Sequence, residues 1–119
     1  MPTSNSRSLA LSLLLAVLSG SLLEPALAGD AAAVRGMVRA KVQALCQNCH
    51  GEDGVALLPG AANLSGQQKE YLRQQLRAYR SGSRRDAQMS VVAKTLTDTD
   101  IESFADWYST IKVTVEMPK

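Results

Sequence analysis

The sequence is poor in the residues that most often bind metals or form disulfides, since its 119 residues include two cysteines and one histidine. All three fall between Cys46 and His50. A framework of several disulfides is therefore excluded, and so is any metal site that needs two histidines. The net charge of +2 is also small, and it indicates nothing about binding to nucleic acid.

The N-terminal segment is apolar but short. The run from Leu9 to Leu18 follows Arg7 and cannot cross a bilayer, which takes about 20 helical residues. Glu24 and Pro25 are expected to break the helix, and the small residues before Gly29 suit signal peptidase. We therefore predict a signal peptide over residues 1–28 that is cleaved after Ala28. The alternative, an uncleaved membrane anchor, places Glu24 at the edge of an already short run.

Residues 29–119 form the predicted mature domain. With about 90 residues, it is long enough for one domain but short for a core that is stable by itself. Small exported domains commonly add disulfides, a metal or a cofactor. Because the cysteines and the histidine are so few and so close together, we expect a single bound group at residues 46–50.

Hydrophobic periodicity predicts an all-α domain with three main helices and a short helical turn. The helical period of the first helix is visible from Asp30 to Leu45. The helix is expected to end near His50, because Gly51 and Gly54 follow. Residues 51–66 show no usable period. The predicted buried face of this first helix consists of Val34, Val38, Val42 and Leu45.

Two further helices are predicted from capping boxes. Ser65 and Gln68 have the spacing of one box, which predicts a helix to about Arg80. Thr97 and Asp100 form the second, and a short turn over residues 90–95 precedes it. The tail from about residue 112 is expected to be loose. The predicted buried positions are Leu72, Leu76 and Tyr79 in one helix, and Ile101, Phe104, Ala105, Tyr108 and Ile111 in the other.

The charges are separated along the chain. Between Lys69 and Arg85 all charged residues except Glu70 are basic, and between Asp98 and Asp106 all are acidic. Such a separation predicts a field that orients the molecule toward a charged partner. The basic residues Lys69, Arg73, Arg77 and Arg80 are interpreted either as a docking face or as an ordinary solvated face.

The residues from Cys46 to His50 read CQNCH, which is the attachment pattern for c-type haem. Cysteines three apart at the end of a helix lie on one side, so both thiols can react with one porphyrin. The histidine that follows then provides an axial ligand to the iron. The pattern therefore predicts one haem c, bound through two thioethers to Cys46 and Cys49, with His50 as a metal ligand.

The same residues permit two other interpretations. A thiol-disulfide oxidoreductase places its cysteines at the start of a helix after a strand, and no strand-helix-strand pattern occurs here. A structural zinc site takes four protein ligands, and only three are present. Both alternatives are therefore less suitable than haem.

The sixth ligand of the iron decides the function. Composition leaves methionine, lysine, water or no ligand, because there is no second histidine. Met37 lies in the helix that leads into the motif, and Met117 lies in the tail. Met89 is far enough beyond His50 for the chain to return on the other face of the haem. We predict Met89 as the sixth ligand, against the alternative of a core side chain that fills a gap.

The sequence resembles the class I cytochromes c, in particular the bacterial monohaem domains of cytochrome c4 and cytochrome c553. The resemblance extends from Asp30 to Ile111. Its blocks are CQNCHGEDG at 46–54, NLSGQ at 63–67, YLRQQLRAYRSGSR at 71–84, MSVVAKTLTDTDI from 89, and the closing ADWYS. The resemblance implies helices wrapped around the haem, His50 and Met89 as axial ligands, and electron transfer rather than catalysis. It also implies that Val38 and Val42 contact Tyr108 where the first and last helices cross.

One position departs from the family. Similar proteins have proline where this chain has Ala62, and the carbonyl of that proline accepts a hydrogen bond from the histidine ligand. Alanine retains the carbonyl but has a less restricted backbone.

The expected function is that of a periplasmic single-electron carrier, a monomer or weak dimer that docks transiently with redox proteins. The alternatives are a dedicated cytochrome subunit of a dehydrogenase or oxidase complex, and a haem enzyme or gas sensor with an open iron site.

Overall fold

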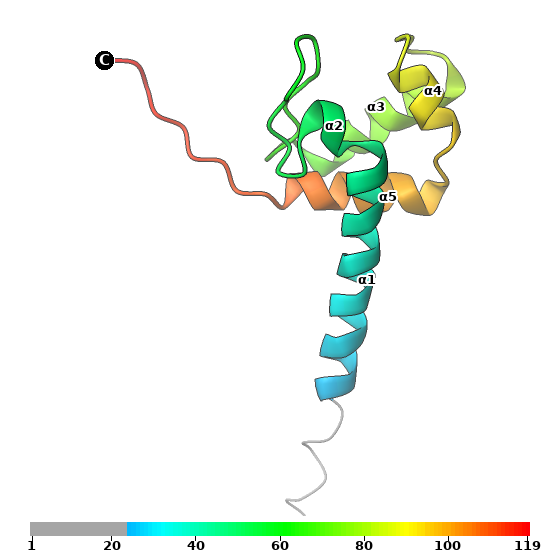
Figure 1. The fold of residues 1–119 in the computed structure, drawn as a ribbon, viewed down its shortest axis with the longest axis vertical. Coiled ribbons are helices and arrows are strands. Elements are labelled where there is room, and N and C mark those ends of the chain that lie inside the picture. The colour runs from blue at the N-terminus through cyan, green and yellow to red at the C-terminus, as the bar shows by residue number, and fades with distance from the viewer. Residues whose placement is uncertain (1–23) are drawn as a thin grey trace, which may run out of the picture. The chain divides into compact units, whose positions relative to one another are not determined.

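A computed structural model describes residues 24–119. The predicted signal segment before residue 24 lies outside the described residues. The elements are α1 (Glu24–Leu45), α2 (Gln47–His50), α3 (Lys69–Ser81), α4 (Met89–Lys94) and α5 (Asp98–Ser109), shown in Figure 1. Residues 24–119 contain no strand, as the all-α prediction requires.

Helix α1 differs from the prediction at both ends. It begins at Glu24 rather than Asp30, and Pro25 lies in its first turn. Proline is well tolerated there because the first amide groups of a helix have no partner inside it, so Glu24 and Pro25 open this helix instead of breaking it. The helix ends at Leu45, and α2 is a separate turn. By its contacts the chain from Val34 to Lys119 forms one unit, which we call the body.

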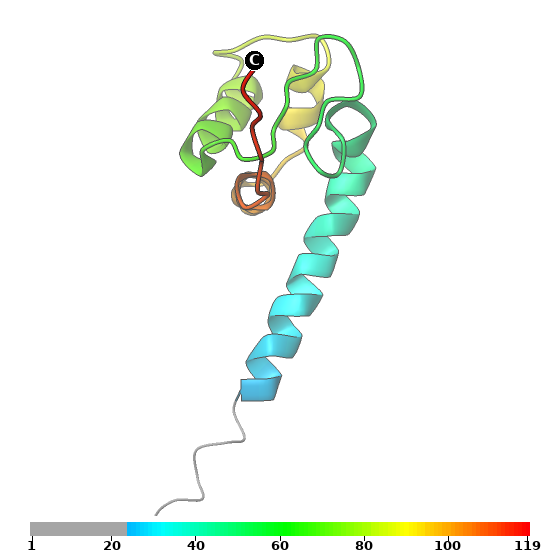
Figure 2. The same ribbon diagram turned by 90° about the vertical axis from the view of Figure 1, so that its left-hand side faces the viewer.

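The core of the body lies where the end of α1 crosses α5 (Figures 1 and 2). Val42 and Ile101 are completely buried, and Val38 packs against the same cluster. Crossing helices touch over only one or two turns. Two positions of the predicted face, Val34 and Leu45, are accordingly exposed. The remaining core residues are Leu72, Leu96, Phe104, Ala105 and Tyr108.

Helix α3 begins later than its predicted capping box. Its N-cap is Gln68, and that side chain makes no capping bond. The reason lies two residues earlier, where the Gly66 N–H donates to the Tyr108 carbonyl at 3.0 Å. Gly66 has a φ of 68°, which is incompatible with a right-handed helix. The predicted box at Ser65 is therefore wrong, because a bond to α5 keeps this segment out of the helix.

Helix α5 begins as predicted. The Thr97 side chain accepts from the Asp100 N–H at 3.1 Å, and the Asp100 carboxylate accepts from the Thr97 N–H at 3.0 Å. Both bonds satisfy amide groups that a helix start would otherwise leave unpaired. The short turn predicted at 90–95 is also present, as α4, and the tail after residue 111 is exposed and irregular.

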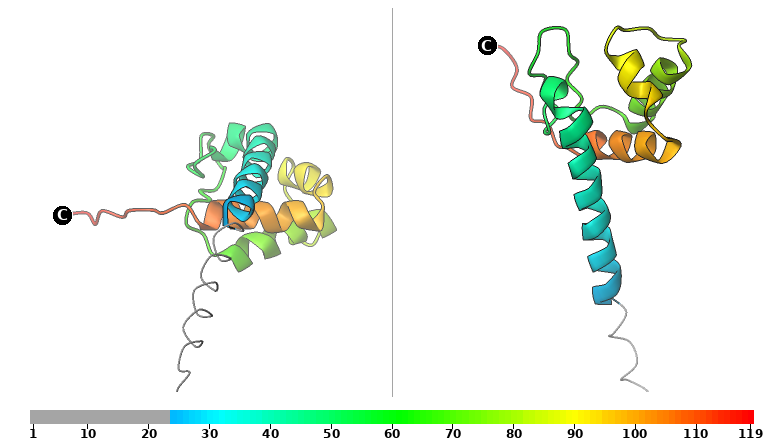
Figure 3. Two further views of the ribbon diagram at one scale, coloured as in Figure 1. Left: turned by 90° about the horizontal axis from the view of Figure 1, so that it is seen from below. Right: turned by 45° about the vertical axis from the view of Figure 1, so that its right-hand side comes forward.

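Helices α3 and α5 lie side by side (Figure 3). Ion pairs join them. The pairs run in opposite order along the two helices, so the helices are antiparallel. They are Lys69–Asp106 at 2.8 Å, Arg73–Glu102 at 3.4 Å, Arg77–Glu102 at 3.1 Å and Arg80–Asp98 at 2.5 Å. We call these pairs the α3–α5 ladder.

The ladder corrects the predicted charge separation. The basic and acidic segments are distant in sequence but adjacent in the body, so most of their charge is compensated by ion pairs, with Glu102 shared by Arg73 and Arg77. The four basic residues are therefore neither a free docking face nor merely solvated. Each pair is partly exposed and contributes little to stability by itself.

No helix among residues 24–119 combines the length and the apolar composition that crossing a membrane requires.

Candidate functional site

The cysteines lie at the junction of α1 and α2. The Cys46 N–H still donates to Val42 O at 2.9 Å, as in a continuing helix. The N–H groups of Cys49 and His50 then donate to Cys46 O at 3.2 and 3.0 Å. This single turn places the two cysteines on one side. Both are free thiols and half-buried, and His50 ends the same turn.

The ionisation of Cys46 argues against thiol-disulfide chemistry. Burial raises the pKa of the Cys46 thiol to about 11. The reacting species in thiol exchange is the thiolate, and oxidoreductases accordingly have cysteines of lowered pKa. At neutral pH this thiol is protonated and unsuited to that role.

A structural zinc site would need a fourth ligand besides Cys46, Cys49 and His50. Within residues 24–119 no three side chains of His, Cys, Asp or Glu are grouped as a metal site requires.

The ring of His50 is oriented by a main-chain carbonyl. Nδ1 lies 2.7 Å from Ala62 O. A carbonyl can only accept, so Nδ1 carries the hydrogen and donates it. The other nitrogen, Nε2, then keeps its lone pair, which is the arrangement found in histidines that bind metals. The alanine at position 62 thus provides the carbonyl that the resemblance implies for this position.

Two aromatic residues of α5 hold the chain immediately after His50. Tyr108, which is only 2% exposed, donates its hydroxyl to Gly51 O at 3.0 Å. Trp107 donates Nε1–H to Glu52 O at 3.0 Å. Both carbonyls are therefore fixed to α5. Sequence predicts only a buried position for Tyr108, and more than 50 residues separate each aromatic from the carbonyl that it bonds, which hides the contact.

The Glu52 side chain ties the same segment to α1. Its carboxylate accepts from Arg39 Nε at 2.6 Å and from Gln43 Nε2 at 2.8 Å. Both bonds lower the pKa of Glu52, and the bond from Gln43 has the larger effect. Together with the two aromatic bonds they form what we call the 51–52 clamp. The clamp joins α1 and α5 directly behind the histidine.

Met89 is the first residue of α4 and is half-buried. Its N–H donates to Asp86 Oδ1 at 2.8 Å, and the Gln88 N–H donates to the same oxygen at 2.9 Å. These two main-chain bonds lower the pKa of Asp86. The hydrogen bonds of Met89 connect it to its own loop and not to residues 46–50. Helices α2 and α4 lie on the same side of α5 (Figures 1 and 3).

Large apolar side chains are exposed in the segments that follow His50 and Met89. In the loop after α2, Val55 is 53% and Leu57 is 64% exposed, and in α4 Val91 is 67% exposed. Apolar surface of this kind marks places where a ligand or partner binds. It suits a large apolar group held by residues 46–50.

Comparison with known proteins identifies the family, although no family model matches the chain. Cytochrome c-554(548) of Halomonas halodenitrificans is 41% identical over 85 residues, which are 69% of this chain and 96% of that protein. The chain belongs to the class I cytochromes c. This cytochrome is also 36% identical to cytochrome c4 of Pseudomonas aeruginosa over 90 residues, 76% of this chain and 42% of that protein.

The cytochrome thus spans nearly all of the Halomonas protein but less than half of the cytochrome c4. A third relative, the thiosulfate dehydrogenase electron acceptor of Thiomonas intermedia, is 37% identical over 70 residues, 58% of this chain and 32% of its own length. The class consists of electron-transfer proteins rather than enzymes, and the prediction of an all-α cytochrome c fold is confirmed.

The residues present fit a covalently bound haem. Two free thiols share one side of a turn, and the next side chain is a histidine whose Nε2 lone pair is available.

Proposed function

We propose that this cytochrome is an exported carrier of single electrons. Cys46 and Cys49 would hold one haem c through thioether bonds, and His50 and Met89 would be its axial ligands. The observation that carries the proposal is the 2.7 Å contact from His50 Nδ1 to Ala62 O, directly after two thiols on one side of a turn. When bound, the haem supplies an iron that changes charge by one unit.

The residues of this chain then act on that centre in three ways. The bond to Ala62 O keeps the hydrogen on Nδ1 and raises the basicity of Nε2. The 51–52 clamp restricts movement of the main chain behind His50. Met89, as the sixth ligand, would raise the reduction potential and leave no position for a substrate. A carrier needs these properties, because its structure should change little between the two oxidation states.

We also propose that residues 1–28 direct export and are removed after Ala28, so that the mature protein acts in the periplasm. Removal would shorten α1 at its start and retain Val38 and Val42, which pack on α5. Mass spectrometry of periplasmic protein would test this proposal. The mature chain is expected to begin at Gly29, and a chain that keeps residues 1–28 would contradict export by cleavage.

The second candidate function is a dedicated electron acceptor of one dehydrogenase. Two relatives, from Thiomonas intermedia and Stutzerimonas stutzeri, are named thiosulfate dehydrogenase electron acceptors. Gel filtration of a native extract separates the two functions. A free carrier elutes near its own mass as a monomer or weak dimer, whereas a dedicated acceptor elutes together with its enzyme.

The ligands are tested by spectra of purified holoprotein in both oxidation states. Met89→Ala is expected to abolish the weak far-red band of sulfur-ligated ferric haem and to allow carbon monoxide to bind. Met37→Ala is the matched control, because Met37 is 62% exposed on α1. It is expected to leave both properties unchanged. If wild-type protein lacks the band and binds carbon monoxide rapidly, the iron site is open and the protein is a haem enzyme or sensor.

Attachment is tested by extraction with acidified acetone. The wild-type pigment is expected to stay with the polypeptide, and a variant that lacks both Cys46 and Cys49 is expected to lose it. Complete extraction from wild-type protein would contradict the proposal.

A further inference from the structure

The α3–α5 ladder leaves some basic residues of the body without acidic partners. Arg84, Arg85 and Lys94 are exposed and form no ion pair with any residue from 24 to 119. They belong to the end of the sequence's basic run and to α4, and we call them the basic patch. Among the basic residues from Lys69 to Lys94, the positive charge without an acidic partner therefore lies at the patch and not along α3.

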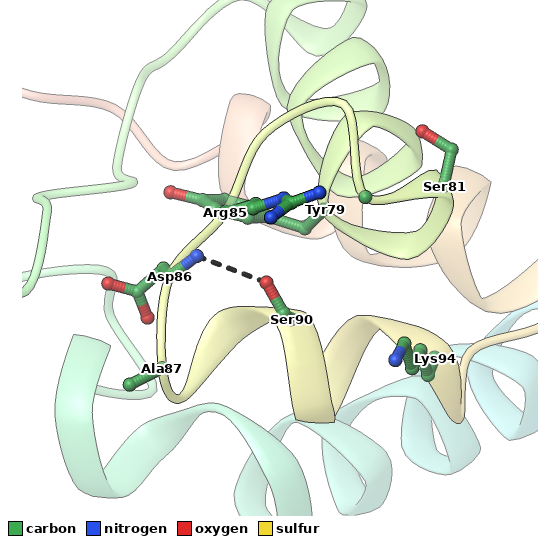
Figure 4. Close-up of a pocket in the computed structure, with 8 residues that line it drawn as sticks. Tyr79, Ser81, Arg85, Asp86, Ala87, Ser90 and Lys94 are labelled. Atoms are coloured by element: carbon green, nitrogen blue, oxygen red, sulfur yellow. Dashed lines mark hydrogen bonds between the residues drawn. The ribbon is translucent and has the colours of Figure 1, made fainter.

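The patch surrounds one open pocket, drawn in Figure 4. Arg85 and Lys94 both line it, together with Tyr79, Ser81, Gly82, Asp86, Ala87 and Ser90. The Arg84 guanidinium lies 4.6 Å from the centre of the Tyr79 ring, and its Nη1 donates to Gln75 at 2.5 Å. These contacts hold Arg84 next to the pocket, so the three cations share one surface.

Asp86 is the acidic residue of this pocket, and its carboxylate is already engaged. It accepts from the N–H groups of Gln88 and Met89, and Figure 4 shows it pointing away from Lys94. The Asp86 N–H is in turn bonded to Ser90 Oγ at 3.0 Å. Even with the charge of Asp86 included, the three cations leave the surface positive. The same loop ends in Met89, so the surface adjoins the predicted ligand.

We propose that the basic patch is the docking surface for an acidic face of a redox partner protein. The proposal rests on the proposed function, because it needs an iron close to Met89. Exposed charges of this kind speed encounter and orient the partner more than they strengthen the final complex. The depression between Arg85 and Lys94 offers room for carboxylates to approach both cations.

The test uses holoprotein on a gold electrode coated with a carboxylate-terminated monolayer, which imitates an acidic protein face. Arg85→Gln/Lys94→Gln is compared with Lys69→Gln/Arg77→Gln, whose residues belong to the ladder. Both doubles lower the net charge by the same amount. At low ionic strength the patch double is expected to bind about tenfold more weakly than wild type, and the ladder double less than about twofold. Both differences should vanish near 1 M salt, where charges are screened beyond about 3 Å.

A conservative double, Arg85→Lys/Lys94→Arg, keeps the charge and is expected to bind like wild type. If the patch and ladder doubles lose binding equally, net charge alone acts and the docking proposal is overturned. Binding of wild type, but not of the patch double, to phosphatidylglycerol vesicles would assign the patch to a membrane surface and also overturn it. The same voltammograms separate this proposal from the function itself. A reversible one-electron wave at unchanged potential in all variants shows an intact centre, and the absence of any wave in wild type means that the proposed function has failed.

Discussion

Replacing Tyr108 by phenylalanine removes one buried hydroxyl and keeps the ring. The lost bond is the one from Tyr108 to Gly51 O at 3.0 Å. Gly51 O also accepts from the Gly54 N–H at 3.3 Å, so the carbonyl is not left without a donor. The cost should therefore be that of a single hydrogen bond, about 1–1.5 kcal/mol of the free energy of unfolding. In a domain of about 90 residues this corresponds to a Tm lower by roughly 5–10 °C.

The assay is thermal unfolding of oxidised holoprotein followed by circular dichroism. Tyr71→Phe is the matched control, because Tyr71 is 45% exposed and its hydroxyl has no hydrogen-bond partner within residues 24–119. That variant should change the free energy of unfolding by less than about 0.5 kcal/mol. Equal Tm values for the two variants would refute the clamp as a stabilising element. A loss greater than about 3 kcal/mol would equally contradict the reasoning, because the phenylalanine ring would then not fill the same space.

Three further predictions concern backbone and charge. Gly60→Ala should lower the free energy of unfolding by about 1–2 kcal/mol, because Gly60 has a φ of 85° but no atom lies within 4 Å of a new Cβ. Gly54→Ala should cost clearly more, because Gly54 has a φ of 77° and its new Cβ would also lie 2.5 Å from the Ser65 nitrogen. Equal Tm values for the two variants would contradict the clash at Gly54. Ala62→Pro keeps the carbonyl that accepts from histidine and should raise the free energy of unfolding in urea by about 0.4–1 kcal/mol, and a decrease would show that proline strains the loop. Hydrogen bonds from Lys41 and, to a smaller extent, Thr97 lower the pKa of Asp100 to about 2. As the pH falls from about 4 to 2, the wild type should therefore lose free energy of unfolding relative to Asp100→Asn. If the free energies of unfolding in urea change equally for both proteins over that range, this prediction is refuted.

The sign of the Asp100 effect follows from the two states. The carboxyl has a lower pKa in the folded protein than the ordinary value of 3.8, so protons bind more readily to the unfolded chain. Its contribution is complete above the unfolded pKa and is lost as the pH falls through the folded one.

Features that depend on neighbours in the chain were predictable from sequence. The capping box at Thr97 and Asp100, the turn of α4 and the proximity of Cys46, Cys49 and His50 all follow from local spacing. The family resemblance added the bond from His50 to residue 62, which the structure contains.

Features that depend on distant contacts were not predictable. The start of α3 is decided by Gly66 bonding to Tyr108, which is more than 40 residues later. Nothing near Gly66 indicates that partner, so the local capping pattern was misleading. The ladder shows the same limitation. In the sequence the basic and acidic segments predict separated charges, and only the adjacency of α3 and α5 in the structure shows that these charges form ion pairs.

The loop after His50 is held mainly through its main chain. Besides Ala62 O and the two carbonyls of the 51–52 clamp, Leu57 N–H donates to Cys49 O at 2.8 Å and Leu64 N–H to Gly54 O at 2.8 Å. Every amino acid except proline provides the same N–H and C=O groups. Random mutagenesis of residues 55–61 should therefore yield many variants that still mature and remain coloured, while shifting their midpoint potentials. This loop is the natural starting point for building a set of carriers with graded redox properties from one scaffold.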